Sequence, residues 1–137
     1  MLRAEITAKR FHERQADTLP GRFALVVTRI EEGRLDAEVA LQPWMLAPNG
    51  HLHAASVLLL ADTAAGHASI AHLPQGAKNF TTIELKSNFL GTMRDGTIRT
   101  ECRAEHLGRT TRVGSAMVFG AAERKLALFR CTQLILW

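Results

Sequence analysis

One long apolar segment constrains this chain more than any other feature. Between Asn49 and Leu73 the sequence contains a glycine-bearing loop, then His51 and His53, then about five helical turns whose strongest helix breaker is Gly66. Alanine, leucine, valine and isoleucine surround the helix axis, which is typical of a helix that is buried on all sides. The segment therefore predicts a central helix that the rest of the chain encloses.

Asp62 is the only full charge within this apolar helix. Aspartate is a poor residue for a helix interior, and a buried carboxylate must be paired, hydrogen-bonded or protonated. Such a conflict between position and chemistry is typical of functional sites. We therefore interpret Asp62 as a candidate catalytic group. The structural alternative is a buried aspartate paired with a lysine or arginine, or an exposed one.

The segments on either side of this helix are mostly strand-like, because apolar and polar residues alternate in them with period two. An amphipathic helix is expected over residues 2–16 and a turn over 18–21, while 94–96 carries a hairpin-turn signal. The expected strands span residues 23–30, 34–42, 81–90, 97–107, 111–119 and 126–137. This order predicts an α+β fold in which a curled antiparallel sheet of about six strands wraps around one long buried helix.

Composition narrows the class of protein. A length of 137 residues suits a single domain, residues 1–137, with a real core. The polar N-terminus lacks a secretory signal, and no apolar run reaches the length of a membrane span of about 20 residues. Cys102 and Cys131 are isolated, which favours a reducing, cytoplasmic location. The net charge of +4 is scattered, so neither nucleic acid nor membrane is an expected partner.

The helix-start motif carries a family resemblance. Gly50, His53, Leu60 and Asp62, in this order of elements, resemble the hotdog-fold thioesterases, and most of all the phenylacetate-degradation (PaaI-like) branch of the 4-hydroxybenzoyl-CoA thioesterase superfamily. Residues 82–86 and 106–109 resemble two further family segments, so the similarity spans nearly the whole chain. The resemblance implies hydrolysis of an acyl-CoA thioester to a free acid and CoA, with CoA as part of the substrate and no other cofactor.

The resemblance also implies roles for single residues. Asp62 matches the acidic residue that acts as general base or nucleophile toward the thioester. Ala54 matches the glycine whose backbone N–H polarises the thioester oxygen, Thr82 a hydroxyl residue that positions the attacking water, and His53 a histidine that shapes the loop. A backbone N–H at a helix N-terminus is well suited to an oxyanion, since it is preorganised and the helix dipole adds to it.

Two departures from the family pattern stand out. Ala54 and Ala55 replace a Gly-Gly pair, and Ala47 replaces the asparagine of the loop. Ala54 is compatible with the oxyanion role only if its φ is negative and its methyl group points away from the substrate. Asn49 lies two positions beyond Ala47 and is the candidate substitute for the missing asparagine.

Several other residues have both a functional and a structural reading. Trp44 and Met45 either line the acyl pocket or fill the core or an interface. His51, His53, His67 and His72 carry no cysteine or carboxylate pattern typical of a metal site, so no metal is expected. The candidates for contact with nucleotide phosphates are Lys86, Arg94, Arg109 and Arg112, for each of which a solvated surface charge is the alternative.

Assembly follows from the distance between the two reaction groups. Ala54 and Asp62 on one helix lie about 12 Å apart along its axis, too far to act on one thioester. A two-fold axis would bring Asp62 of one copy to the Ala54 N–H of another, so a homodimer or homotetramer with shared sites is expected. Two other functions remain open: a hydratase or dehydratase that pairs His53 with Asp62, and a non-catalytic module that binds acyl thioesters.

Overall fold

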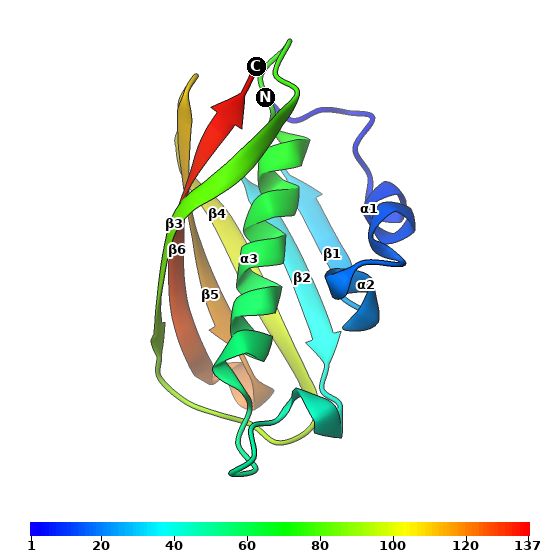
Figure 1. The fold of residues 1–137 in the computed structure, drawn as a ribbon, viewed down its shortest axis with the longest axis vertical. Helices are drawn as coiled ribbons and strands as arrows, with labels where there is room; N and C mark the ends of the chain where they lie inside the picture. Colours follow the sequence, from blue (N-terminus) through cyan, green and yellow to red (C-terminus); the bar gives the residue numbers. More distant parts are fainter.

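The computed structural model describes all 137 residues, and it places the long helix α3 (Ala54–Ala71) in the concave face of one six-stranded sheet (Figure 1). The strands follow the order β1-β2-β4-β5-β6-β3, and each neighbouring pair is antiparallel. Their bounds are β1 Val26–Glu31, β2 Arg34–Ala40, β3 Asn79–Phe89, β4 Thr97–Leu107, β5 Thr111–Phe119 and β6 Lys125–Leu136. The expected α+β architecture is confirmed.

The helix α3 is buried on one side rather than on all sides. Leu60, Ala61 and Ala64 face the sheet and are almost fully buried, whereas Asp62 and His67 on other sides of the helix are only half-buried. The expectation of burial all round was wrong because the curled sheet covers the helix from one side only (Figure 1). By length and mean hydropathy α3 also matches a membrane span, against the expectation, but half of it is buried inside the protein, as in the core helix of a soluble domain.

The N-terminal helix is shorter than the sequence pattern suggested. The helix α1 spans Ala8–Gln15, because Thr7 caps it by accepting a hydrogen bond from the Arg10 N–H at 3.3 Å. The residues before Thr7 are not helical, because they bond to another part of the chain: the Arg3 N–H donates to the Ala71 carbonyl at 2.8 Å. The expected turn over 18–21 is a short helix, α2 (Leu19–Arg22).

The turn at Gly96 does not form a hairpin. Gly96 has a φ of +87°, as a tight turn requires, but the two strands beside the turn never pair. Instead β3 pairs with β6 at one edge of the sheet, while β4 lies between β2 and β5. The segment between β3 and β4 therefore crosses the end of the molecule where α3 begins (Figure 1).

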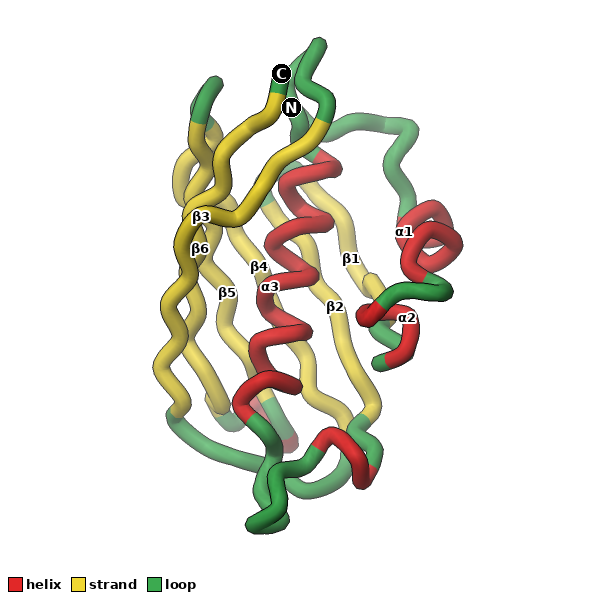
Figure 2. Tube along the Cα trace, viewed as in Figure 1, coloured by secondary structure: helices red, strands yellow, loops and turns green.

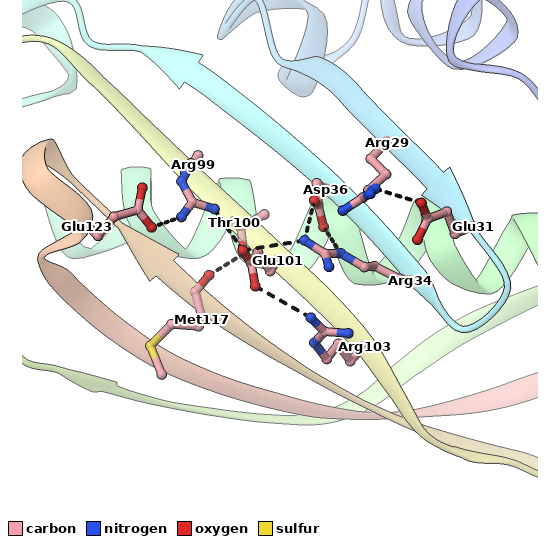
Figure 3. Close-up of polar contacts among 10 residues, drawn as sticks. All are labelled: Arg29, Glu31, Arg34, Asp36, Arg99, Thr100, Glu101, Arg103, Met117 and Glu123. Carbon is pink, nitrogen blue, oxygen red and sulfur yellow. Dashed lines mark hydrogen bonds and ion pairs between the residues drawn. The ribbon is translucent and has the colours of Figure 1, made fainter.

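The outer face of the sheet carries a ladder of ion pairs. Arg34 contacts Asp36 at 2.7 Å and Glu101 at 3.4 Å, and Arg99 contacts Glu101 at 3.0 Å (Figure 3). The buried neighbours of these residues in the strands, such as Leu35 and Ile98, point inward to α3. The outer face of β2 and β4 is thus a charged, solvated surface.

Both chain termini lie beside the C-terminal end of α3 (Figure 2). The loop that leads into α3 lies at the opposite end, where Pro43–Met45 forms a short 3-10 helix, η1. The molecule therefore presents two different ends, one with the helix N-terminus and one with both termini.

Candidate active site

The start of α3 is fixed by His53. This residue has extended φ and ψ of −67° and 135°, and its Nδ1 accepts a hydrogen bond from the Ala55 N–H at 2.9 Å. Its own N–H donates to the Met45 carbonyl at 3.2 Å, and the Ser56 hydroxyl donates to the same carbonyl at 2.8 Å. His53 is thus the N-cap of α3, and its Nδ1 is occupied by the backbone of the helix.

Among the first backbone N–H groups of α3, that of Ala54 is free. The N–H groups of His53, Ala55 and Ser56 all have acceptors within the protein, whereas Ala54 has none. Ala54 is exposed, and its φ is negative, as the oxyanion role requires of an alanine. One preorganised donor at the positive end of the helix dipole therefore points to solvent.

Asp62 lies near the middle of α3 without a counterion. Its carboxylate forms no salt bridge, and Oδ1 is buried without any hydrogen-bond partner in the protein. Burial raises the pKa of this carboxyl above its usual range, because the charged form loses hydration. The alternative of a buried aspartate paired with a lysine or arginine is therefore wrong. An unpaired carboxylate of raised pKa is a stronger base toward water.

Two thiols lie close to this region but remain protonated. Burial raises the pKa of Cys131 to about 11, and the nearby charge of Asp62 adds to the effect. Burial likewise raises the pKa of Cys102 to about 12. Both cysteines are unpaired, as expected, and neither is a thiolate nucleophile at neutral pH.

Thr82 faces α3 in a polar row across three strands. A bulge between Thr82 and Glu84 shifts the alternation of β3, so that Thr82 pairs with the buried Gln133 of β6. Gln133 in turn pairs with Arg112 of β5, which is also buried. Directly paired residues share a face of the sheet, and the row Thr82–Gln133–Arg112 therefore points to the helix.

In the loop before α3, the Asn49 side chain forms a hydrogen bond within the loop itself. Asn49 is exposed, and its Oδ1 accepts a hydrogen bond from the His51 N–H at 3.1 Å. Met45 is buried in the core, whereas Trp44 is 59 % exposed and contacts Phe23 edge-on at 4.9 Å between ring centroids. Of the two residues with a possible place in the acyl pocket, only Trp44 has a free surface.

The four cationic candidates lie in different places. Arg109 and Arg112 line one groove, at the end of the molecule where both termini lie. Arg94 is exposed in the connection between β3 and β4, and Lys86 lies beside Arg130 on the outer face of the sheet. The structure brings only Arg109 and Arg112 together.

Each of the histidines makes its own separate contacts within the fold. His72 donates from Nδ1 to the Ala68 carbonyl at 2.8 Å, while its Nε2 accepts from the Gly33 N–H at 2.9 Å. His67 stacks on Phe11 with ring centroids 4.1 Å apart. No group of three or more histidine, cysteine or carboxylate side chains lies close enough together to hold a metal ion.

Three polar residues near the groove escaped the sequence pattern. Arg3 lines the groove, and Ser69 hydrogen-bonds through its hydroxyl to Gln133 beneath α3. No pattern in the sequence around Arg3 predicts that this residue lines a groove. The signal for Gln133 was present, because Gln133 shares its inward register with Phe129 and Cys131, which are both buried.

The comparison with known proteins identifies the family. A family model described as the thioesterase superfamily matches residues 49–127, so the chain belongs to this superfamily. The matched region contains the cap His53, the free N–H of Ala54, and Asp62. The chain is thus a thioester hydrolase, as its resemblance implied.

Individual relatives agree with this assignment. The proofreading thioesterase EntH of Klebsiella pneumoniae is 26% identical over 132 residues, which are 96% of each chain. A thioesterase from Pseudomonas aeruginosa has a similar structure, with a TM-score of 0.93 and 22% identity over 98% of this chain and 97% of that one. The PaaI protein of E. coli matches with a TM-score of 0.83 and 19% identity, over 93% and 91% of the two chains. The hotdog fold is thereby confirmed.

Proposed function

We propose that the chain hydrolyses an acyl-CoA thioester in a site shared by two copies. Asp62 of one copy is the general base or the nucleophile, and the Ala54 N–H of the second copy binds the thioester oxygen. Acyl-thioester hydrolysis in general follows from the superfamily. The observation that carries the finer proposal is the Asp62 carboxylate, which is unpaired, partly buried and raised in pKa.

These two groups suit the chemistry of the reaction. Attack on a thioester carbon places negative charge on the carbonyl oxygen, and the free Ala54 N–H at a helix N-terminus stabilises that charge. Removal of such a donor typically costs about 3 kcal/mol in barrier. In the general-base route, Asp62 takes a proton from water as the water oxygen attacks, and the proton then passes to the departing thiolate.

A second copy is proposed because the edge strand β3 is exposed and apolar. This strand spans Asn79–Phe89 and pairs on one side only, with β6. Ile83, Leu85 and Phe89 on it are 57 %, 41 % and 47 % exposed. A long apolar edge strand is normally covered, because its free N–H and C=O groups and its side chains favour pairing. Antiparallel pairing with the same strand of a second copy would cover all three side chains.

Such pairing would also complete the site. With β3 against β3 around a two-fold axis, the two α3 helices run antiparallel on the same side of one continuous sheet. Asp62 of one helix then lies level with the start of the other, which carries the free Ala54 N–H. In this proposal Thr82, on the helix-facing side of β3, holds the attacking water between them; its register with Gln133 supports this role.

The test is a panel of acyl-CoA esters assayed for release of free thiol. The wild type should hydrolyse at least one ester, and Asp62→Asn should reduce its turnover at least about a hundredfold. Asp17→Asn makes the same chemical change at an exposed position and should retain full activity. Near wild-type turnover by Asp62→Asn contradicts the catalytic assignment. A change in enoyl absorbance without thiol release would indicate a hydratase, and tight binding without turnover a binding module.

A further inference from the structure

Three buried N–H donors converge on one cavity beneath the C-terminal half of α3. Nε and Nη1 of Arg112 and Nε2 of Gln133 are buried and have no hydrogen-bond partner in the protein. Arg112 is 5 % exposed and Gln133 is 2 % exposed. Apart from Oδ1 of Asp62, no other buried side-chain nitrogen or oxygen lacks a partner. Such groups are rare because each costs free energy, so three together require an explanation.

The cavity between these donors is small, and its unpaired N–H groups favour a negatively charged occupant. It lies between α3 and the sheet, and it leaves about 20 Å³ in which the centre of a water-sized atom can lie. Gln133 Oε1 is already occupied by the Ser69 hydroxyl, so the amide offers only its N–H groups. His72 lines the cavity as well, but both of its ring nitrogens are bonded to backbone. The unpaired side-chain groups of Arg112 and Gln133 are therefore all donors, which suits an anionic oxygen.

Arg112 also lines an open groove on its other side. This groove shares His72, Leu107 and Arg112 with the inner cavity and has a volume of about 750 Å³. It lies at the end of the molecule where both termini are found (Figure 2). An oxygen in the inner cavity could thus belong to a larger group that lies in the groove.

Two further guanidinium groups line the groove, and each is held in place. Arg3 donates from Nε to the Leu73 carbonyl at 3.1 Å and from Nη2 to the Pro74 carbonyl at 3.3 Å. Arg109 lies over the ring of Trp137, with 4.5 Å from Cζ to the ring centroid. Neither of them, nor Arg112, forms a salt bridge within the protein.

The charge of the groove is unbalanced. Its lining contains three guanidinium groups and a single carboxylate, the exposed Glu5. Burial lowers the pKa of Arg112, and repulsion by Arg3 lowers it further. Like charges held this close are stabilised when an anion lies between them.

We propose that Arg112, Gln133, Arg3 and Arg109 form a binding site for a phosphate group. One phosphate oxygen enters the inner cavity and accepts from Arg112 and Gln133, while the remaining oxygens face Arg3 and Arg109 in the groove. A phosphate group suits this site because it has several acceptor oxygens in a tetrahedral arrangement, and arginine forks bind such oxygens in pairs. The site stands independently of the roles proposed for Asp62 and Ala54.

Two sources could supply this phosphate group: inorganic phosphate or the nucleotide part of CoA. His72 at the groove lies about 15 Å along α3 from Asp62. A nucleotide source would therefore connect the groove with the reaction site, whereas inorganic phosphate would make it a separate site. Both share the same chemistry at Arg112.

The experiment is isothermal titration of the wild type with inorganic phosphate, in chloride buffers of constant ionic strength. Binding is expected, and Arg112→Met should weaken it at least about tenfold, since the central fork is lost. Arg109→Met removes an exposed groove cation and should weaken binding without disturbing the core. Arg22→Met is the matched control, because Arg22 is exposed and outside the groove, and should bind as the wild type does.

Competition then identifies the source. If CoA displaces phosphate and dephospho-CoA does so less well, the site binds a nucleotide phosphate; if neither competes, it binds free phosphate. The proposal is overturned if the wild type binds none of these, or if Arg112→Met and Arg109→Met both bind phosphate as tightly as the wild type. Should Arg112→Met fail to fold, Arg112→Lys and Arg109→Met carry the test.

Discussion

The Ala54 N–H and the Asp62 carboxylate lie on one helix, about 12 Å apart along its axis, and each lacks a partner within its own chain. A carboxylate that activates water must come within about 3 Å of it, and the same holds for a donor and the thioester oxygen. In the proposed mechanism, one chain therefore holds two halves of a reaction site that it cannot close alone. The predictions below test each half and then their combination.

Ala54→Gly should preserve or raise activity. The substitution keeps the free N–H and removes only the methyl group, which in the proposed site narrows the mouth of the cleft. The gain should be larger for bulky acyl groups than for small ones, as measured by kcat/KM over a panel of acyl-CoA esters. A large loss of activity in a folded Ala54→Gly variant would show that the methyl group itself is needed.

Asp62→Asn should change how stability depends on pH. Burial raises the pKa of Asp62 in the folded protein above the usual value of 3.8, so the folded state binds the proton more tightly than the unfolded state does. The contribution of this group to stability is then present at low pH and is lost as the pH rises from 3.8 through the raised pKa. The asparagine variant has no such loss. Its stability relative to wild type, from urea unfolding, should therefore increase with pH over this interval.

The exposed Asp17→Asn is the control for that measurement. It should leave the pH dependence of the free energy of unfolding close to that of the wild type. A constant difference between Asp62→Asn and wild type at every pH would mean that the carboxyl of Asp62 is not perturbed in the folded protein.

His67 should make the protein less stable in acid. Burial lowers the pKa of His67 from 6.5 to about 4, with the charges of His12 and Arg14 adding to the effect. The unfolded state then takes up the proton first, so stability falls as the pH decreases from 6.5 to about 4, by an upper limit of about 3 kcal/mol.

His67→Gln should remove this part of the acid dependence, because glutamine does not titrate. The exposed His106→Gln should retain it. The measurement is urea unfolding at a series of pH values from 4 to 7, and an unchanged slope in His67→Gln would rule out a perturbed His67.

The sequence predicted the fold well where the patterns are local. The alternation of residues 97–107 and 111–119 predicted β4 and β5 with their observed bounds, and the long apolar run predicted α3. Strand pairing was harder, since Gly96 makes a tight turn whether or not its flanking strands are neighbours. The cap at Thr7 and the tie of Arg3 to Ala71 shortened the first helix, and both depend on contacts that periodicity does not describe.

The candidate site was predictable in part. Asp62 was predictable because a lone charge in an apolar helix can be recognised from the sequence alone. The free N–H of Ala54 follows from its place just after the N-cap His53. The pairing of Gln133 with Arg112 could not be found in the same way, because strand register decides which residues meet across a sheet.

The central claim, a site shared by two copies, can be tested with two variants, each of which removes one of the two proposed reaction groups. Ala54→Pro removes the proposed oxyanion donor with little other change, because Ala54 is the first helical residue and its N–H makes no hydrogen bond. The preceding residue, His53, already has the extended ψ of 135° that a following proline requires. Asp62→Asn removes the proposed base. Each variant alone should be folded and nearly inactive.

The most direct measurement is the activity of these two variants after they are denatured together in equal amounts and refolded. In a mixed dimer, Asp62 of the proline variant meets the intact Ala54 N–H of the asparagine variant, so one of its two sites is complete. Random pairing should then restore about one quarter of wild-type activity, whereas each variant refolded alone should stay inactive. Mixed dimers that are verified by mass and remain inactive would contradict the shared site, as would a fully active wild-type monomer at assay concentration.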